Sequence, residues 1–345
     1  MKPTQASHAQ ASHAQASHAQ ANEASQANEA TAQANGGPRV VAIGGGHGLA
    51  STLRAARSYA GELTAIVSVA DDGGSSGRLR QGLGIPAPGD LRKCLVALAD
   101  PGSLWARTFE HRFEAGELEG HAVGNLIIAG LAEQSGDFTQ ALHQASQLLG
   151  VSARVLPATS EPVVLCAEVA GEAVVGQVNV AAARDAISSV CLVPSDPAVP
   201  EEVIAAVEEA DQVVIGPGSL FTSVLAACAV PTLREALQRR TGGRVYVCNL
   251  RPQLPETAGF SAADHLRALA AHRVPVDVML VDVGALTARD HCLQDHCLED
   301  QYLEGVKVVT AAVGRADLSA HDPERLASAL TALAAPELDR SGGIG

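Results

Sequence analysis

From Pro38 onward, short runs rich in Val and Ile alternate with helix-forming stretches rich in Ala and Leu. Short apolar runs of this kind are typical of strands in a parallel sheet that is covered on both faces. The expected strands are 39–43, 63–70, 212–215, 244–249, 276–282 and 306–310. The expected helices are 49–59, 90–99, 123–134, 138–149, 201–209, 219–228, 232–240 and 261–272. The alternation predicts an α/β fold with a doubly wound, mostly parallel sheet.

One stretch departs from this alternation. In VVLCAEVAGEAVVGQVNV, at 163–180, two β-rich runs meet near Gly171, which predicts a β-hairpin excursion from the sheet. No linker rich in Pro, Gly or Ser divides the chain. We therefore expect one domain over 38–335, followed by a flexible C-terminus at 336–345.

The first 37 residues are of low complexity. ASHAQ occurs three times in succession at 6–20 and is followed by QANEASQANEA. Such a segment has too few apolar side chains to offset the entropy of ordering, so we expect a disordered tail over 1–37. Its histidines His8, His13 and His18 could bind a metal weakly, but repeat expansion explains their spacing better.

Charge and cysteine usage narrow the function class. The 345 residues are 47% hydrophobic, enough for a core of normal size, and carry a formal net charge of -14. A surface that acidic argues against nucleic-acid binding, because no basic stripe is present to release counterions. No apolar run is long enough for a membrane span, and the N-terminus has no secretion signal. The seven cysteines are scattered without a C-x-x-C pair, so we expect reduced thiols and a cytoplasmic location.

A first candidate site follows the first expected strand, where GGGHGL leads into a helix. Backbone N–H groups at a helix N-terminus, together with the helix dipole, suit a phosphate. The dinucleotide fingerprint G-x-G-x-x-G is not met, because Leu49 stands where its third glycine would be. A tight turn with packing glycines is the alternative. The candidate ligand-binding residues here are Gly44, Gly45, Gly46, His47 and Gly48.

The most specific string is ADDGGSSGRLR at 70–80, which leaves the second expected strand. Its paired carboxylates could take a ribose hydroxyl or a magnesium ion. Its Gly/Ser run could form an anion-binding nest, and its arginines could fork onto phosphate. A plain flexible loop is the alternative. The candidate residues are Asp71, Asp72, Gly73, Gly74, Ser75, Ser76, Gly77 and Arg78.

Four further strings hold candidates of the same kind. Asp90 is expected to be a helix N-cap, with Arg92 in the first helical turn, and Asn125 lies beside a glycine at a helix start. Ordinary capping and a buried structural Asn are equally good explanations. The third string is a Gly-Pro-Gly-Ser turn, in which Ser219 is expected to cap a helix. The fourth is the loop that follows the expected strand 244–249. The candidates are Asp90, Asn125, Gly216, Gly218, Ser219, Asn249, Glu256, Thr257 and Phe260.

These candidates share a position in the expected fold. In an open parallel sheet, ligands bind beyond the C-terminal ends of the strands, where the strand order reverses. If the strands are parallel, the loops 44–48, 71–78, 216–219 and 249–257 converge on that edge. The string DHCLQDHCLED at 290–300 is different, because DHCL is duplicated and its spacing does not suit a closed zinc site. We interpret it as a variable surface stretch.

Long motifs in this chain resemble the gluconeogenesis-factor (YvcK-like, UPF0052) family. They are GGGHGL, VADDGGSSGRLR, PGDLRKCLVALAD, GNLIIAGL, IGPGSLFTSVL and CNLRPQLPETAGFSAADHL, which occur in the family's order over 39 to about 330. That family is similar to the 2-phospho-L-lactate transferases, so the resemblance implies a Rossmann-like α/β sandwich. It also implies that the glycine loops and the residues named above line a cleft for a UDP-sugar such as UDP-N-acetylglucosamine.

The resemblance further implies a role in growth on gluconeogenic carbon sources, in cell shape and in peptidoglycan synthesis. A serine/threonine kinase, cell-wall synthesis proteins and a homo-oligomer are possible partners on the same ground. The transferases have a motif closer to Thr-Gly-Asp-Asp at the second strand and lack the Gly-Gly-Ser-Ser-Gly-Arg run, which argues against phospholactyl transfer here.

Three functions are therefore compared. A ligand-sensing regulator fits the many backbone and phosphate-directed groups, since no nucleophile–base pair is evident in the sequence. A transferase acting on a nucleotide-diphospho substrate, with Asp71 or Asp72 holding Mg²⁺, is the first alternative. An NAD-dependent oxidoreductase is the second, because Asp71 follows Gly48 at near the ribose-binding spacing.

Overall fold

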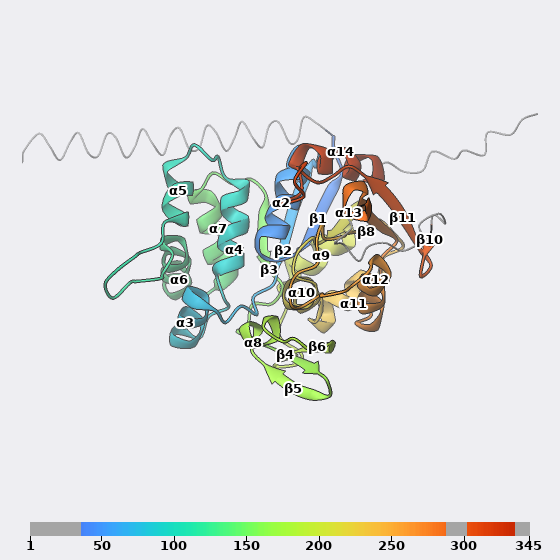
Figure 1. Ribbon diagram of the computed structural model, residues 1–345. Coiled ribbons are helices and arrows are strands. Elements are labelled where there is room, and N and C mark those ends of the chain that lie inside the picture. The colour runs from blue at the N-terminus through green and yellow to red at the C-terminus, as the bar shows by residue number, and fades with distance from the viewer. Residues whose placement is uncertain (1–35, 288–301, 335–345) are drawn as a thin grey trace, which may run out of the picture.

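A computed structural model describes residues 36–287 and 302–334, and its centre is a long sheet (Figure 1). The strands of this sheet lie in the order β10-β11-β9-β8-β7-β1-β2-β3. All neighbouring pairs are parallel except β10 and β11, which confirms the doubly wound, mostly parallel sheet. The bounds are β1 Arg39–Gly44, β2 Glu62–Val67, β3 Arg154–Pro157, β7 Gln212–Ile215, β8 Arg244–Val247, β9 Val278–Asp282, β10 Tyr302–Leu303 and β11 Val306–Ala311.

The strand order reverses at β1. From β1 the chain proceeds through β2 to β3 on one side, whereas β7, β8, β9 and β11 follow one another on the other side. Right-handed crossovers in opposite directions place their connecting helices on opposite faces of the sheet. The carboxyl ends of β1 and β7 therefore flank the position at which open α/β sheets bind ligands.

The expected helices are confirmed, with shifted ends. α2 begins at Gly46 rather than Leu49, and the stretch 220–228 starts as a π-helical turn, η1, that continues into α10. The helices between β1 and β3 are α2 Gly46–Ala56, α3 Gly74–Leu83, α4 Gly89–Leu98, α5 Leu104–Glu110, α6 Val123–Ser135 and α7 Phe138–Leu148. The later ones are α8 Gln177–Ala181, α9 Glu201–Glu209, η1 Leu220–Leu225, α10 Ala226–Cys228, α11 Pro231–Arg239, α12 Ala262–Ala271, α13 Val283–Thr287 and α14 Pro323–Ala334.

The predicted hairpin is present and belongs to a separate small sheet, drawn at the bottom of Figure 1. β4 (Val164–Val169) and β5 (Glu172–Val175) pair antiparallel, and the turn uses positive φ angles at Ala170 and Gly171. The sequence interpretation of 163–180 was incomplete in two respects. A third strand, β6 (Ile187–Val193), pairs with β4, and residues after Gly176 form the helix α8 instead of more strand.

Several predictions concern residues outside the described ranges. They are the disordered tail at 1–37 (of which only 36 and 37 are described), the flexible end at 336–345 and the DHCL duplication. In the described part of the chain, Cys94, Cys166, Cys191, Cys228 and Cys248 are free thiols. There, no single helix is long and apolar enough to cross a membrane; the bent pair Leu220–Cys228 and Pro231–Arg239 qualifies together by length and composition only.

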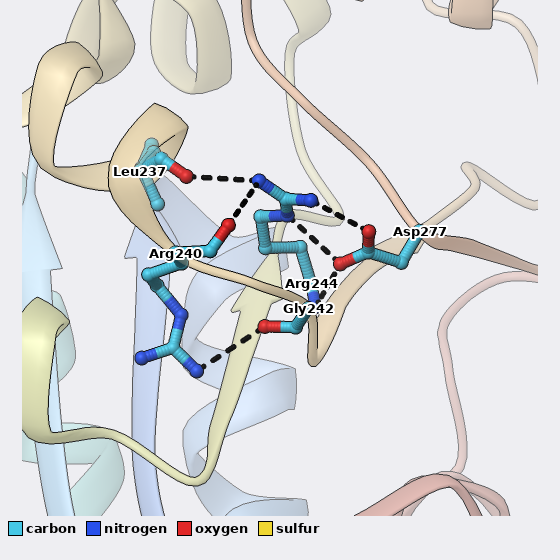
Figure 2. Close-up of polar contacts among 5 residues, drawn as sticks. All are labelled: Leu237, Arg240, Gly242, Arg244 and Asp277. Carbon is cyan, nitrogen blue, oxygen red and sulfur yellow. Dashed lines mark hydrogen bonds and ion pairs between the residues drawn. The ribbon is translucent and has the colours of Figure 1, made fainter.

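A bidentate ion pair joins the starts of two central strands (Figure 2). Arg244 Nε donates to Asp277 Oδ2 at 2.8 Å and its Nη2 donates to Asp277 Oδ1 at 2.6 Å, while the backbone N–H of Arg244 also donates to Asp277. The remaining Nη1 donates to the carbonyl oxygens of Leu237 and Arg240 at the end of α11. Since the Arg244 side chain is only 12% exposed, Asp277 neutralises a guanidinium that is largely removed from water.

Replacing Asp277 with alanine is expected to lower the free energy of unfolding by about 2–3 kcal/mol, because a mostly buried guanidinium would lose its counter-charge. Urea denaturation followed by circular dichroism measures the change. Glu208→Ala is the matched control, since Glu208 pairs with Arg239 at the surface and should contribute at most ~1 kcal/mol. Equal losses in the two variants would contradict this account of Asp277.

Candidate functional site

The first glycine loop forms a helix N-terminus that no side chain caps. β1 ends at Gly44, Gly45 occupies the N-cap position, and α2 starts at Gly46 without a side-chain cap bond or an acidic residue in its first turn. Gly46 has a φ of +62°, a conformation that favours glycine. The free N–H groups and the helix dipole make this end suitable for an anion. The His47 side chain reaches the surface here. Partial removal of its imidazole from water, followed by the charge of Lys93, lowers the pKa of the ring.

The second loop lies against the first. Gly216 and Gly218, which follow β7, have φ angles of +74° and +146°. A Cβ on Gly48 would lie 2.3 Å from Pro217 O, so α2 and this loop are in backbone contact. Asn249, which follows β8, braces the loop: its Oδ1 accepts from Gly218 N at 3.0 Å and its Nδ2 donates to Gly218 O at 2.8 Å. The structure thus brings the 44–48, 216–219 and 249 candidates together at the carboxyl ends of β1, β7 and β8.

Ser219 stands at the N-cap position of η1, but its side chain makes no cap bond, contrary to the prediction. Glu256 replaces it. Its Oε1 accepts from the N–H groups of Phe221 (2.6 Å) and Thr222 (3.3 Å), and its Oε2 accepts from the Thr222 hydroxyl. Burial raises the pKa of the Glu256 carboxyl, although these hydrogen bonds oppose the shift. Glu256 therefore holds a helix start within the site.

The other two candidates of the 249–257 region also support the backbone. Thr257 is fully buried, and its hydroxyl accepts from Gln253 N at 2.8 Å. Phe260 packs edge-to-face on Phe221 and on His265. Ser261 and Asp264 then form a capping box at the start of α12.

The string after β2 differs from its prediction. Only 68–73 lies outside regular structure, because α3 begins at Gly74, and the Gly/Ser run forms its first turn rather than an open nest. Gly73 N donates to Asp71 Oδ1, and a Cβ on Gly77 would lie 1.9 Å from Asp72 O. Asp72 accepts at 3.0 Å from the N–H groups of both Gln177 and Val178, so it joins the site to α8.

Ser75 belongs to a buried network that sequence reasoning found only in part. Asn125 Nδ2 donates to Ser75 Oγ at 3.0 Å, and Asn125 Oδ1 accepts from Arg92 Nε at 3.0 Å. His121 Nδ1 lies 3.0 Å from the same Ser75 hydroxyl. Because Ser75, Arg92 and Asn125 lie on α3, α4 and α6, the network links these three helices. His121 was missed because no spacing in the sequence relates it to Ser75.

Asp90 is not the predicted N-cap, a position taken by Pro88; it lies in the first turn of α4 and pairs with Lys93 at 3.0 Å. Its carboxylate is close to the first glycine loop, since a Cβ on Gly45 would lie 2.6 Å from Asp90 Oδ2. Burial raises the pKa of the Asp71 carboxyl; the Gly73 hydrogen bond opposes the shift, and the negative charge of Asp90 adds to it. Since a Cβ on Gly89 would lie 3.2 Å from Asp71 Oδ2, Asp71 lies beside the start of α4 and forms a pair of neighbouring carboxylates with Asp90 there.

Arg78 faces a cavity of about 740 Å³ beside α3, where Asp72, Gly74 and Gly77 also contribute to the lining. Arg80, Gln81, Arg112 and Gly120 complete the lining, and Arg112 was not a sequence candidate. Within the described ranges, no group of three His, Cys, Asp or Glu side chains is arranged to hold a metal ion.

Comparison with known proteins identifies relatives along almost all of the described chain. The family model described as 2-phospho-L-lactate transferase CofD matches residues 40–317. A gluconeogenesis factor from Halalkalibacterium halodurans is 45% identical over 235 residues, 68% of this chain and 73% of that protein. A relative from Mycobacterium leprae is 41% identical over 316 residues, 88% of each chain. The chain spans only about half, 52%, of a 44% identical relative from Nostoc.

A crystal structure shows the same fold. The structure of a UPF0052 family member from Bacillus halodurans superposes with a TM-score of 0.78 at 38% identity, over 85% of this chain and 98% of that one. Sequence identity above 40% over most of the chain, a matching family model and a shared fold agree with one another. The chain therefore belongs to the CofD-like family and, within it, to the gluconeogenesis factors of the UPF0052 group.

Proposed function

We propose that this protein is a regulator that binds a nucleotide-type ligand, specifically a UDP-sugar such as UDP-N-acetylglucosamine, at the carboxyl edge of its main sheet. The observation that carries the proposal is the contact between the 44–48 and 216–219 loops at the point where strand order reverses. At this point the N-terminus of α2 has no side-chain cap. A diphosphate is the ligand group that such an end suits.

The polar side chains at this edge favour binding over chemistry. Asn249 and Glu256 are engaged with backbone groups of the 216–222 segment, and Asn125 is engaged with Ser75 and Arg92. Side chains held in this way keep a loop rigid and lower the entropy lost on binding. They would make poor nucleophiles or bases. A sensing role also agrees with the relatives that carry the name gluconeogenesis factor.

Calorimetric titration of the full chain with UDP-N-acetylglucosamine tests the proposal, with NAD titrated in parallel and each run with and without Mg²⁺. We expect micromolar binding of the UDP-sugar without turnover. Absence of UDP-sugar binding together with a signal for NAD would refute it. The third glycine of the dinucleotide fingerprint is replaced by Leu49, a buried residue of α2, so we expect NAD to bind weakly.

Asn249→Asp is expected to weaken UDP-sugar binding at least tenfold. The change removes the donor to Gly218 O and places a carboxylate beside the loop that is proposed to face the diphosphate. Gln238→Glu is the matched control, since Gln238 also donates to one carbonyl oxygen, Arg273 O, but is exposed on α11. If both variants bind as the unchanged protein does, the 216–219 loop does not contact the ligand.

A transferase is the second candidate, and the carboxylate pair Asp71 and Asp90 favours it. Two carboxylates beside a phosphate site suit Mg²⁺, which uses one or two protein carboxylates and completes its shell with phosphate oxygens and water. The matching family model is that of a transferase. Mg²⁺-dependent consumption of a nucleotide-linked substrate, lost in Asp71→Asn, would select this function over the sensor.

The biological setting follows from the same proposal. A regulator of this type would act on growth with gluconeogenic carbon, on cell shape and on peptidoglycan synthesis, with a serine/threonine kinase and cell-wall synthesis proteins as partners. A deletion strain complemented with Asn249→Asp tests this directly. If a variant that no longer binds the UDP-sugar still restores growth and cell shape, these roles do not depend on the ligand.

A further inference from the structure

The cavity beside α3 gathers three arginines. It measures about 740 Å³ and lies between α3 and the segment 112–120, with Arg78, Arg80 and Arg112 in its lining. Arg78 and Arg112 are exposed and Arg80 is half-buried, so the cavity is open to solvent. In a chain of net charge -14, three guanidinium groups in one lining are a local exception.

Each arginine is anchored by one backbone carbonyl. Arg78 Nη2 donates to Glu119 O at 2.7 Å, Arg80 Nη1 donates to Val163 O, and Arg112 Nη1 donates to Gly120 O. A guanidinium has five N–H donors in a planar fork. These anchors therefore fix the side chains while leaving most donors available to a group in the cavity.

The three arginines have no ion-pair partner among the described residues. None of the three forms an ion pair with a carboxylate of residues 36–287 or 302–334. One carboxylate, that of Asp72, lines the cavity. Both of its oxygens accept hydrogen bonds, from the backbone N–H groups of Gln177 and Val178. The lining therefore carries three positive charges and one negative charge, which leaves an excess of positive charge.

The positive charge of these arginines lowers the pKa values of two neighbouring groups. Burial lowers the pKa of the His121 imidazole, and the charges of Arg78 and Arg112 lower it further. Burial also lowers the pKa of the Arg92 guanidinium, with Arg112 as the next cause. An oxyanion in the cavity would offset the excess positive charge and use the free forks, because planar guanidinium groups match the oxygens of a phosphate.

We propose that Arg78, Arg80 and Arg112 form a binding site for a multiply charged oxyanion of the phosphate-ester class. The site shares none of its arginines with the glycine loops at β1 and β7, and it does not depend on the ligand of those loops being a UDP-sugar. The anion has two possible sources. It is either a phosphate of the same ligand or a separate phosphorylated effector.

Calorimetry with inorganic pyrophosphate on the full chain tests the site. We expect binding that weakens as ionic strength rises and that falls at least tenfold in Arg112→Gln. Arg57→Gln is the matched control, because Arg57 also donates to one backbone carbonyl, Leu98 O, but follows the far end of α2; its affinity should stay within twofold. No measurable pyrophosphate binding, or equal effects of the two substitutions, would overturn the proposal.

Arg112→Gln also removes the hydrogen bond to Gly120 O and could disturb the 112–120 segment. Gln81→Glu is a second variant that avoids this problem. The variant places a carboxylate in the lining and leaves all three arginine anchors in place. It should weaken pyrophosphate binding at least tenfold without lowering the melting temperature, whereas Gln134→Glu on the exposed surface of α6 should change neither. Undiminished pyrophosphate binding in Gln81→Glu would contradict the site.

Titration of UDP-N-acetylglucosamine into Gln81→Glu, compared with the unchanged protein, then assigns the source of the anion. Weaker UDP-sugar binding means that a phosphate of the same ligand occupies the cavity, and unchanged or stronger binding means a separate effector. Both results uphold the oxyanion site. Failure of UDP-sugar binding alone would refute the proposed function and leave the pyrophosphate result standing.

Discussion

Replacing Gly48 with alanine is expected to lower the free energy of unfolding by about 2–3 kcal/mol and to weaken nucleotide binding at least tenfold. A Cβ at this position would lie 2.3 Å from Pro217 O, 2.6 Å from Pro217 C and 2.7 Å from Gly218 Cα. All three are backbone atoms, so no flexible side chain can move aside. Either α2 or the 216–219 loop must shift, and both belong to the edge that is proposed to bind the diphosphate.

Gly130→Ala provides the control for this prediction. Gly130 also lies within a helix, α6, but a Cβ there would meet no heavy atom within 4 Å. The control should stabilise the protein by roughly 0.5–1 kcal/mol, because alanine loses less backbone freedom than glycine in a helix. Urea denaturation and calorimetry measure both variants. A Gly48→Ala protein as stable as the Gly130→Ala protein would mean that the two loops are not held in close contact.

Six of the eight strands of the main sheet could be predicted because their signals are local; β3 and β10 were not among the expected strands. β7 was predicted at its observed bounds, 212–215, since an apolar run is ended by Gly216 and Pro217. The same combination of an apolar run and following glycines located β1 and the glycine turn after it. Since parallel strands direct their carboxyl ends to one edge, the convergence of their loops followed from the strand assignments alone.

α3 shows where local signals mislead. Gly-Gly-Ser-Ser-Gly has low helix propensity and was interpreted as a loop. Tertiary contacts overrule that preference: Ser75 bonds with Asn125, and Gly77 approaches Asp72 O too closely for any side chain. At Gly77 a glycine is required by packing within the protein.

The roles of the polar candidates could not be predicted, because their partners are distant in sequence. Asn249 bonds with Gly218, 31 residues away, and Glu256 with Phe221, 35 residues away. Either residue could equally have faced a ligand. Arg112 gave no signal at all, since it lies outside every glycine motif and joins the cavity only through the fold.

Acidification from neutral pH to about pH 5 is expected to destabilise the protein through two buried histidines. His265 is 2% exposed, lies 2.9 Å from the Tyr246 hydroxyl and contacts the ring of Phe260. Burial lowers the pKa of His265 to about 4. Burial also lowers the pKa of His321 to about 4, against the opposing effects of a hydrogen bond with the Cys248 backbone and the charge of Asp282.

The sign follows from proton uptake. In the unfolded chain each histidine titrates near its ordinary pKa of 6.5, whereas in the folded protein it stays neutral down to about pH 4. Between these values the unfolded state binds more protons, so the free energy of unfolding falls as the pH falls. The stabilisation is complete above pH 6.5. At pH 5 the loss is roughly 2 kcal/mol for each histidine.

His265→Gln separates this contribution from the rest of the titration. Urea denaturation of both proteins at about pH 7.5 and pH 5 gives two losses of stability, and the loss in the variant should be smaller by about 2 kcal/mol. His143→Gln, at an exposed position on α7, is the control and should lose as much as the unchanged protein. The carboxylates contribute equally to the loss of stability in all three proteins, so their contribution cancels when the losses are compared. If His265→Gln loses as much stability as the unchanged protein, His265 accepts a proton without unfolding, and the neutral Tyr246–His265 contact is not what acid disrupts.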